Sequence, residues 1–438
     1  MIRLDDLRNS FEGVIPAIIG TLDGDGMPNI SYLSHVYYVD DSHVALSNQF
    51  FSKTADNVKQ TGVATVMVVD PTSGGQHVLD LQFERSCDDG DIFEQVSTHL
   101  DVMSMLHGVA DVMKLRSADI YRVSAVRQVL GAAPLAPEPE PLPRCNRLAR
   151  SARIITAIAA EDDADTILDA ALDGLRDEMQ FDHVMVLLPD DDGETLSTVA
   201  SRGYDRFGAG AEIGMGVGVI GMAAKARRAV RIADLSRVHR YARAISEGGL
   251  IPLPGLDRPQ CQMAVPMLVK GQMRGIVFVE SEQSFAYTHE DEEALILIAN
   301  QLGSALLLAE LQAQSAPARQ PAAVTPVIGG GGFRFKYYAH DDSVFIDDDY
   351  LIKGVPGRLL YHFVRSYVEN GRSDFSNREI RRETALKLPD IKDNLETRLI
   401  LLRKRLEDKS GPLRLTRPER GQVRLEVDGL PRIEIVVG

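Results

Sequence analysis

Residues 390–408 read DIKDNLETRLILLRKRLED, and this stretch decides how the C-terminal part of the chain folds. Its apolar side chains recur every three or four residues, as expected for a helix that buries one face. They are Ile391, Leu395, Leu399, Leu402 and Leu406. The basic residues on its outer faces are Lys392, Arg398, Arg403, Lys404 and Arg405. Such a helix suits phosphate contact and docking in the major groove of DNA, but an ordinary solvated helix has the same pattern.

The sequence on either side of this stretch predicts a compact domain. Residues 333–347 contain two alternating strands, and residues 357–370 have the apolar spacing of a helix that Gly371 ends. Ser376-Asn-Arg-Glu is a capping box and predicts a second helix through Leu386. Residues 413–427 predict a two-stranded hairpin. The opening stretch is therefore the third helix of a small domain over residues 333–438.

This order of strands, three helices and a hairpin resembles the winged helix-turn-helix domain of response-regulator transcription factors. The resemblance rests on Leu399-Ile-Leu-Leu-Arg-Lys-Arg-Leu-Glu, Leu413-Arg-Leu-Thr-Arg and Gly421. It implies that the third helix and the wing contact DNA. The implied DNA-binding residues are Lys392, Asn394, Arg398, Arg403, Arg417 and Arg420. Asp390 and Asp393 depart from this pattern because carboxylates repel phosphates, so a winged helix used for protein contact is the alternative.

The charge distribution bears on this choice. The net charge of −15 argues against nucleic acid as a partner, because an acidic surface repels a polyanion. From residue 333 to residue 438, however, there are 21 Lys and Arg against 18 Asp and Glu, a net charge of +3. That leaves −18 for the first 332 residues. The acidic excess is confined to the upstream region, which weakens the objection without removing it.

Composition predicts a globular protein of several domains. With 438 residues, 44% of them hydrophobic and 25% charged, the chain has room for about two to four cores. Residues 132–144 form a proline-rich spacer, and residues 315–332 form a glycine-rich tether. We therefore expect domains at residues 1–131, 145–314 and 333–438. We see no apolar run of about 18 residues and no secretory leader, so we expect a cytoplasmic protein without membrane contact.

The first segment is predicted to consist of short, mostly antiparallel strands. Residues 20–29 and 47–57 together resemble the pyridoxamine 5'-phosphate oxidase-like, FMN-binding split-barrel family. That resemblance implies an antiparallel split β-barrel and FMN as a cofactor. The implied cofactor-binding residues are Ser47, Gln49, Ser52, Lys53, Thr54 and Asn57.

The residues of this motif also permit a structural interpretation. A lysine beside hydroxyl groups at a helix N-terminus suits a phosphate, because backbone N–H groups and one cation point to the same place. Alternatively, Ser52 is only a helix cap and Lys53 a solvated residue of the first turn. His35, near a strand end, either faces a flavin ring or serves in packing.

The second segment predicts two helices, a set of strands and a long closing helix over residues 290–312. Four of its segments, at residues 214–223, 230–235, 264–267 and 275–281, resemble in this order a GAF domain. The resemblance covers about residues 147–312 and implies an α/β/α sandwich that binds a small-molecule effector. It also implies dimerisation through the terminal helices, at residues 145–160 and 290–312.

The cysteines favour neither a disulfide framework nor a zinc site. Cys87, Cys145 and Cys261 are far apart and form no C-x-x-C pair. Cys261 precedes an inner strand, where it is either a redox-active or metal-contacting thiol or a small buried residue. We assign no metal ligand and no catalytic residue.

The fold class predicted from the sequence is multidomain α+β: an N-terminal antiparallel split β-barrel, a central GAF α/β/α sandwich and a C-terminal winged helix. The predicted function is a ligand- or redox-responsive, homodimeric, one-component transcriptional regulator that binds DNA. Two alternatives stay open. One is an FMN-dependent oxidoreductase with regulatory domains, and the other is a signalling scaffold whose winged helix contacts proteins.

Overall fold

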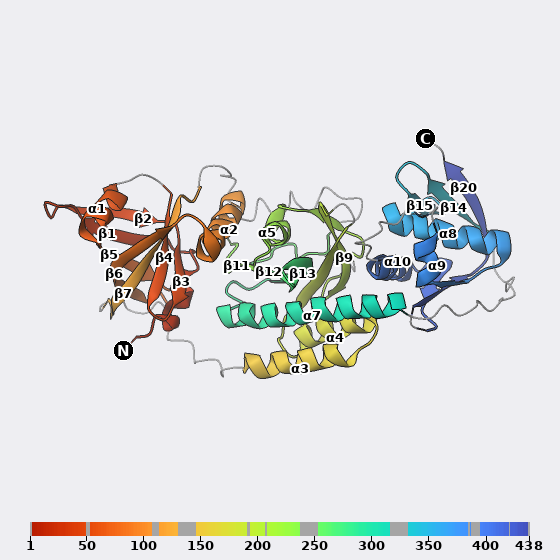
Figure 1. Ribbon diagram of the computed structural model, residues 1–438, viewed down its shortest axis with the longest axis horizontal. Coiled ribbons are helices and arrows are strands. Elements are labelled where there is room, and N and C mark those ends of the chain that lie inside the picture. The colour runs from red at the N-terminus through yellow and green to blue at the C-terminus, as the bar shows by residue number, and fades with distance from the viewer. Residues whose placement is uncertain are drawn as a thin grey trace.

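The computed structural model describes residues 2–49, 53–106, 114–129, 146–190, 193–205, 208–236, 253–315, 332–383, 386, 395–419 and 421–436. Over these residues the chain is a mixed α/β protein with mostly antiparallel sheets, and three regions follow one another along its long axis (Figure 1). The spacer predicted at 132–144 lies outside the described residues, as does the tether at 315–332 apart from its two end residues.

The N-terminal region is built on one antiparallel sheet. Its elements are η1 (Asp5–Phe11), β1 (Ala17–Leu22), β2 (Pro28–Leu33), β3 (Val36–Asp40), β4 (His43–Asn48), α1 (Lys53–Thr61), β5 (Val63–Val69), β6 (Gln76–Cys87), α2 (Gly90–Leu106) and β7 (Ser117–Gln128). The strand order is β2-β1-β5-β6-β7-β4-β3. In β5 the residues Ala64, Val66 and Val68 alternate into the core, as period-two patterning requires. The predicted antiparallel strands are confirmed, and their closure into a split barrel stays a prediction.

The central region has three layers. Its elements are α3 (Arg147–Ala160), α4 (Ala164–Asp177), β8 (His183–Pro189), β9 (Thr195–Arg202), β10 (Glu212–Gly214), α5 (Gly218–Ala226), β11 (Val230–Ile232), β12 (Cys261–Val269), β13 (Gln272–Ser281) and α7 (His289–Ser315). The sheet order is β10-β9-β8-β13-β12-β11. Val184 and Val186 of β8 join the core that includes α3, α4 and α7, whereas Met185 and Leu187 join the core that includes α5. The sheet therefore buries both faces between helices.

Helix α7 is long and apolar enough to cross a bilayer, by length and composition, over His289–Ala313. A helix that packs in the core of a globular domain has the same properties. Leu295, Ile298 and Leu302 of α7 are fully buried in the core that includes the central sheet. The length and composition of α7 are thus explained by packing, and localisation stays a prediction.

The C-terminal region contains two small sheets and a helical layer. Its elements are β14 (Gly332–Tyr338), β15 (Ser343–Ile346), β16 (Asp349–Ile352), α8 (Gly354–Asn370), β17 (Asp374–Ser376), α9 (Asn377–Arg382), α10 (Leu395–Lys409), β18 (Leu413–Thr416), β19 (Gln422–Val427) and β20 (Leu430–Val436). One sheet has the order β16-β15-β14-β20, and the other has the order β17-β19-β18. The capping box at Ser376 and the left-handed Gly371 after α8 are both present.

The structure corrects two expectations for this region, and a third falls partly outside the described residues. Strands β16, β17 and β20 were not predicted, and β20 pairs in parallel with β14 from the far end of the region. Helix α9 ends at Arg382 rather than Leu386, because Glu383 leaves the helical conformation. Helix α10 begins at Leu395 among the described residues, so the acidic start of the predicted helix, with Asp390 and Asp393, lies outside them.

Candidate functional site

Helix α10 has the apolar stripe that its sequence predicts. Leu395, Leu399, Leu402 and Leu406 are all buried in the core that also includes α8 and β18. Because these leucines fix the rotation of α10 about its own axis, they also decide which side the basic residues occupy.

The basic side of α10 is not the open surface that the sequence predicts. Arg398 and Arg405 are themselves buried. Arg405 donates from Nε to the carbonyl oxygen of Leu351 at 2.9 Å and pairs with Asp408. Burial lowers the pKa of Arg398 to about 10, and the carboxylate of Asp190 acts in the opposite direction. The prediction that these two arginines lie on an outer face is therefore wrong, because the neighbouring elements cover them.

Helix α4 of the central region supplies the surface that faces these cations. Asp163 caps α4, accepting a hydrogen bond from the backbone N–H of Asp165. Asp165 lies in the first turn, where the helix dipole favours a carboxylate. Asp169 follows one helical turn later on the same face. Three carboxylates are thus displayed along the start of one helix.

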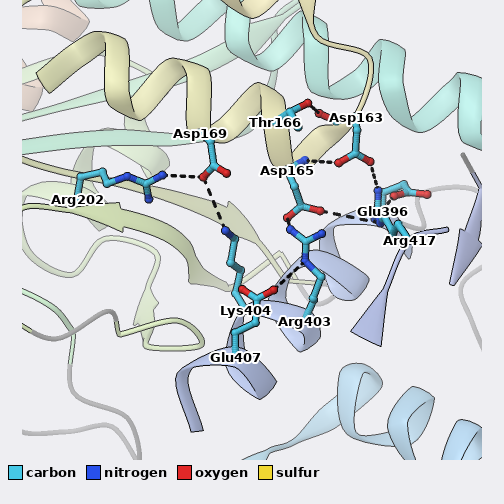
Figure 2. A network of polar contacts seen from close by, with 10 residues as sticks. All are labelled: Asp163, Asp165, Thr166, Asp169, Arg202, Glu396, Arg403, Lys404, Glu407 and Arg417. Carbon is cyan, nitrogen blue, oxygen red and sulfur yellow. Dashed lines mark hydrogen bonds and ion pairs between the residues drawn. The ribbon is translucent and has the colours of Figure 1, made fainter. Parts of the chain in front are cut away.

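The carboxylates of α4 and the cations of the C-terminal region form one network (Figure 2). Arg403 pairs with Asp165, and Lys404 lies 3.7 Å from Asp169 between Nζ and Oδ1. Arg417, which follows β18, pairs with Asp163 and approaches Asp165 at 3.9 Å between Nε and Oδ2. The ribbons of α4 and α10 thus meet through their charged side chains.

The same network extends into the C-terminal region itself. Arg417 also pairs with Glu396 of α10, which accepts a hydrogen bond from Asn377 of α9. The relative solvent exposure of the side chain is only 18% for Arg403, 11% for Lys404 and 16% for Arg417. Arg403, Lys404 and Arg417 are therefore covered by acidic residues of the same chain.

Burial shapes the electrostatics of this network. Burial raises the pKa of Asp165 to about 6, although Arg403 and Arg417 oppose that shift. For Arg417, burial acts to lower the pKa, but Glu396, Asp163 and Asp165 together raise it. Neither oxygen of Asp165 meets hydrogen-bond geometry, so its contacts are electrostatic. The network holds charged groups that are costly to bury unless they stay paired.

The predicted DNA-binding residues divide into two groups. Arg398, Arg403 and Arg417 are described. Arg403 and Arg417 pair with α4 of the central region, and Arg398 is buried where the carboxylate of Asp190 acts on its pKa. Lys392, Asn394 and Arg420 lie outside the described residues. No sequence pattern singles out Asp163, Asp165 and Asp169 as functional residues. The only signal available was their common face on a predicted helix, which is also typical of a solvated surface.

The predicted cofactor-binding residues lie around the start of α1. Ser47 and Gln49 are buried, and the Ser47 hydroxyl lies 3.4 Å from the carbonyl oxygen of His35. Among the described residues, the side-chain nitrogen of Gln49 has no hydrogen-bond partner. Ser52 lies outside the described residues.

The remaining members of that set contact the β1–β2 hairpin. Lys53 pairs with Asp23 at 3.3 Å, and Thr54 accepts a hydrogen bond from Asn29. Asn57 donates to Thr21 at 3.1 Å. Among the described members of the set Lys53 is the single cation, and it is already paired. These side chains pack α1 on the hairpin, and binding of a flavin phosphate by this set stays a prediction.

A cavity of about 350 Å³ lies between the N-terminal and central regions. His35 and His99 stack in its wall with ring centroids 4.2 Å apart. The pKa of His99 is lowered to about 4, mainly by burial and secondly by the positive charge of the nearby Arg231. Burial also holds the pKa of His35 well below its usual value. Both imidazoles are therefore neutral at physiological pH.

A buried arginine joins the two regions beside this cavity. Arg231 of β11 pairs with Glu12 of the N-terminal region and with Glu292 of α7, both at 2.8 Å. The ring nitrogen Nδ1 of His35 is buried and has no hydrogen-bond partner in the part of the chain that the structure describes. The cavity is thus lined by neutral imidazole rings and by an arginine that is already paired with two carboxylates.

Cys261 lies in the core of the central region, at the start of β12. Its side chain is fully buried, and burial raises the pKa of its thiol to about 11. The thiol is therefore protonated at neutral pH, in agreement with the interpretation of Cys261 as a small buried residue. The described residues contain no group of three or more His, Cys, Asp or Glu side chains placed to hold a metal.

Comparison with known proteins places the central region in a family. A search of solved structures finds the GAF domain of an Acinetobacter phosphoenolpyruvate-protein phosphotransferase, at 20% identity over 38% of this chain and 95% of that chain, with a TM-score of 0.33. It also finds the free methionine-R-sulfoxide reductase of Neisseria meningitidis, at 18% identity over 38% of this chain and 91% of that chain, with a TM-score of 0.32.

For the N-terminal region the search finds an FMN-binding protein of Syntrophomonas wolfei subsp. wolfei, at 18% identity over 28% of this chain and 85% of that chain, with a TM-score of 0.25. No curated protein matches the chain. The GAF domain family model matches residues 161–307, which span α4 to α7. Residues 161–307 of this chain are therefore a GAF domain.

Proposed function

We propose that this protein is a ligand-responsive regulator whose C-terminal region binds DNA as a winged helix. The observation that carries the proposal is the gathering of Arg403, Lys404 and Arg417 on one side of the C-terminal region. Cations that converge from a helix and from the end of a following strand suit a phosphate backbone. The polyanion-binding surface, as we use the term, consists of these three residues.

The order of elements in the C-terminal region supports this proposal. A small sheet precedes α8, α9 and α10, and the hairpin of β18 and β19 follows α10 directly. In a winged helix this position belongs to the recognition helix, with the hairpin as the wing. Arg417 is then a wing residue beside the recognition helix.

The input side of the proposal rests on the central region. A GAF domain suggests a signalling or ligand-sensing role. The cavity between the N-terminal and central regions is a second candidate for a small-molecule effector, because a ligand there would contact both regions at once. Its lining favours an uncharged or weakly charged polar molecule over a phosphate, since Arg231 is already paired with two carboxylates.

The N-terminal region contributes sensing or assembly rather than oxidase chemistry in this proposal. FMN binding stays a prediction, and an oxidoreductase function finds no support in the paired Lys53. We propose a homodimer, because a two-fold regulator would read paired half-sites on DNA.

The experiment that tests DNA binding uses the full chain and mixed-sequence duplex DNA over a range of salt concentrations. Binding is expected to weaken steeply with salt, because phosphate contacts release counterions. Arg403→Glu is expected to weaken binding by about tenfold or more, since it places a carboxylate where a phosphate must lie.

The matched control is Arg365→Glu. Arg365 lies on α8, is well exposed and pairs with Glu369, so the same change of charge occurs away from the polyanion-binding surface. The affinity of the Arg365→Glu variant for DNA is expected to stay within about threefold of the affinity of the unchanged protein. Equal effects of the two substitutions, or no binding by any of the proteins, would refute the proposed function.

A further inference from the structure

The first turns of α4 lie where the DNA backbone would have to lie. Asp163, Asp165 and Asp169 each contact a different cation of the polyanion-binding surface. We propose that this acidic face of α4 is an internal competitor of DNA, and that the structure is the closed state of the regulator. The inference rests on the proposed function, because it names how that same surface is controlled.

The pairing has the pattern expected of a competitor. Arg417, Arg403 and Lys404 pair in order with Asp163, Asp165 and Asp169 (Figure 2). Asp165 also approaches Arg417, so the three carboxylates together cover all three cations. The cations are largely covered, and a phosphate cannot reach them while α4 stays in place. Binding of DNA and docking of α4 are therefore mutually exclusive.

The contact is also of a kind that a polyanion can displace. The side chains of Asp163 and Asp169 stay about two-fifths exposed, so water already reaches the edges of the network. Ion pairs at such partly exposed positions contribute little each. Asp165 is the buried member, and its carboxylate lies between Arg403 and Arg417.

The acidic face of α4 belongs to the GAF domain, so a change within that domain can alter its contact with the C-terminal region. Arg202 of β9 pairs with Asp169 at 2.7 Å, and Asp169 also contacts Lys404. Helix α4 packs against β8, β9 and α7. A ligand that shifts β9 or α4 within the GAF domain thus changes the carboxylates that cover the cations. This arrangement is a two-state contact that both an effector and DNA can bias.

The test compares three full-length proteins for binding of mixed-sequence duplex DNA at one fixed salt concentration. They are the unchanged protein, Asp163→Asn with Asp165→Asn, and Asp173→Asn with Asp177→Asn. The second pair is a matched control because it removes two charges from the same helix, where Asp173 pairs with Arg202 and Asp177 with Arg176. Asparagine at position 163 keeps a side chain that caps a helix as well as aspartate does.

We expect the variant with Asp163→Asn and Asp165→Asn, called the 163/165 variant, to bind DNA with a Kd about tenfold or more below that of the unchanged protein. The reason is that the apparent affinity for DNA scales with the fraction of protein in which α4 does not cover the cations. The 173/177 variant is expected to change by about threefold or less. If the 163/165 variant loses its fold by circular dichroism, Asp163→Asn alone, at a partly exposed position, is expected to tighten binding to a smaller extent.

The outcomes separate this inference from the proposed function. Equal DNA affinity of all three proteins, or equal tightening in both variants, would overturn closure by α4 and leave DNA binding intact. Failure of every protein to bind DNA would overturn the proposed function, and closure with it.

Discussion

The carboxyl group of Asp165 is nearly inaccessible to solvent, and burial raises its pKa from about 3.8 to about 6. A group whose pKa is raised in the folded state stabilises that state most at low pH, and this contribution is lost as the pH rises through the folded pKa. Below about pH 6, Asp165 is therefore mostly protonated where it is buried beside Arg403. Acidification from neutral pH favours the docked arrangement through this residue.

We predict that Asp165→Asn removes this pH dependence. Between about pH 4 and about pH 7 the free energy of unfolding of the unchanged protein should fall relative to that of the variant, by up to about 3 kcal/mol. Thermal unfolding of both proteins across this range measures the difference. A difference that is constant with pH, or that grows in the opposite direction, would show that Asp165 titrates normally.

Other residues show what the sequence could predict at this scale. The burial of Leu399, Leu402 and Leu406 follows from their spacing alone. The burial of Arg398 and Arg405 does not, because an arginine on a helix can be solvated or covered and the spacing is the same in both cases. The sequence therefore predicted the basic residues of the candidate site, but not the carboxylates of α4 that pair with them.

Helix α9 shows how local chemistry sets an element. The Ser376 side chain accepts from the backbone N–H of Glu379, and the Glu379 side chain accepts from the backbone N–H of Ser376. Both contacts are readable in the sequence, and the start of α9 agrees with them. The end of the helix and the strands β17 and β20 were not readable, because they depend on pairing with β19 and β14 far along the chain.

We predict that Ser376→Ala destabilises the C-terminal region by about 1 kcal/mol, the usual cost of losing a capping hydroxyl. Urea unfolding, followed by a probe in that region, measures the change. Ser366→Ala on α8, whose helix begins well before this residue, is the control and should change stability by less than about 0.5 kcal/mol. Equal effects of the two substitutions would mean that the cap contributes nothing.

At the scale of the whole molecule, the sequence identified the GAF domain but not its contacts. The resemblance covered about residues 147–312, and the family match covers 161–307. Asp163 and Arg417 are 254 positions apart, and no local pattern indicates that they meet. Contacts between regions depend on complementary surfaces that form only after each region has folded. The closed arrangement could therefore be seen only in the structure.

The central claim is that DNA and α4 compete for the same cations. Hydrogen exchange at the backbone amides of α4 and α10, in the full chain with and without duplex DNA, tests it most directly. We expect saturating DNA to slow exchange in α10 and to speed exchange in the first turns of α4, as Asp163 and Asp165 lose their partners. Slowed or unchanged exchange in α4 while DNA is bound would contradict it.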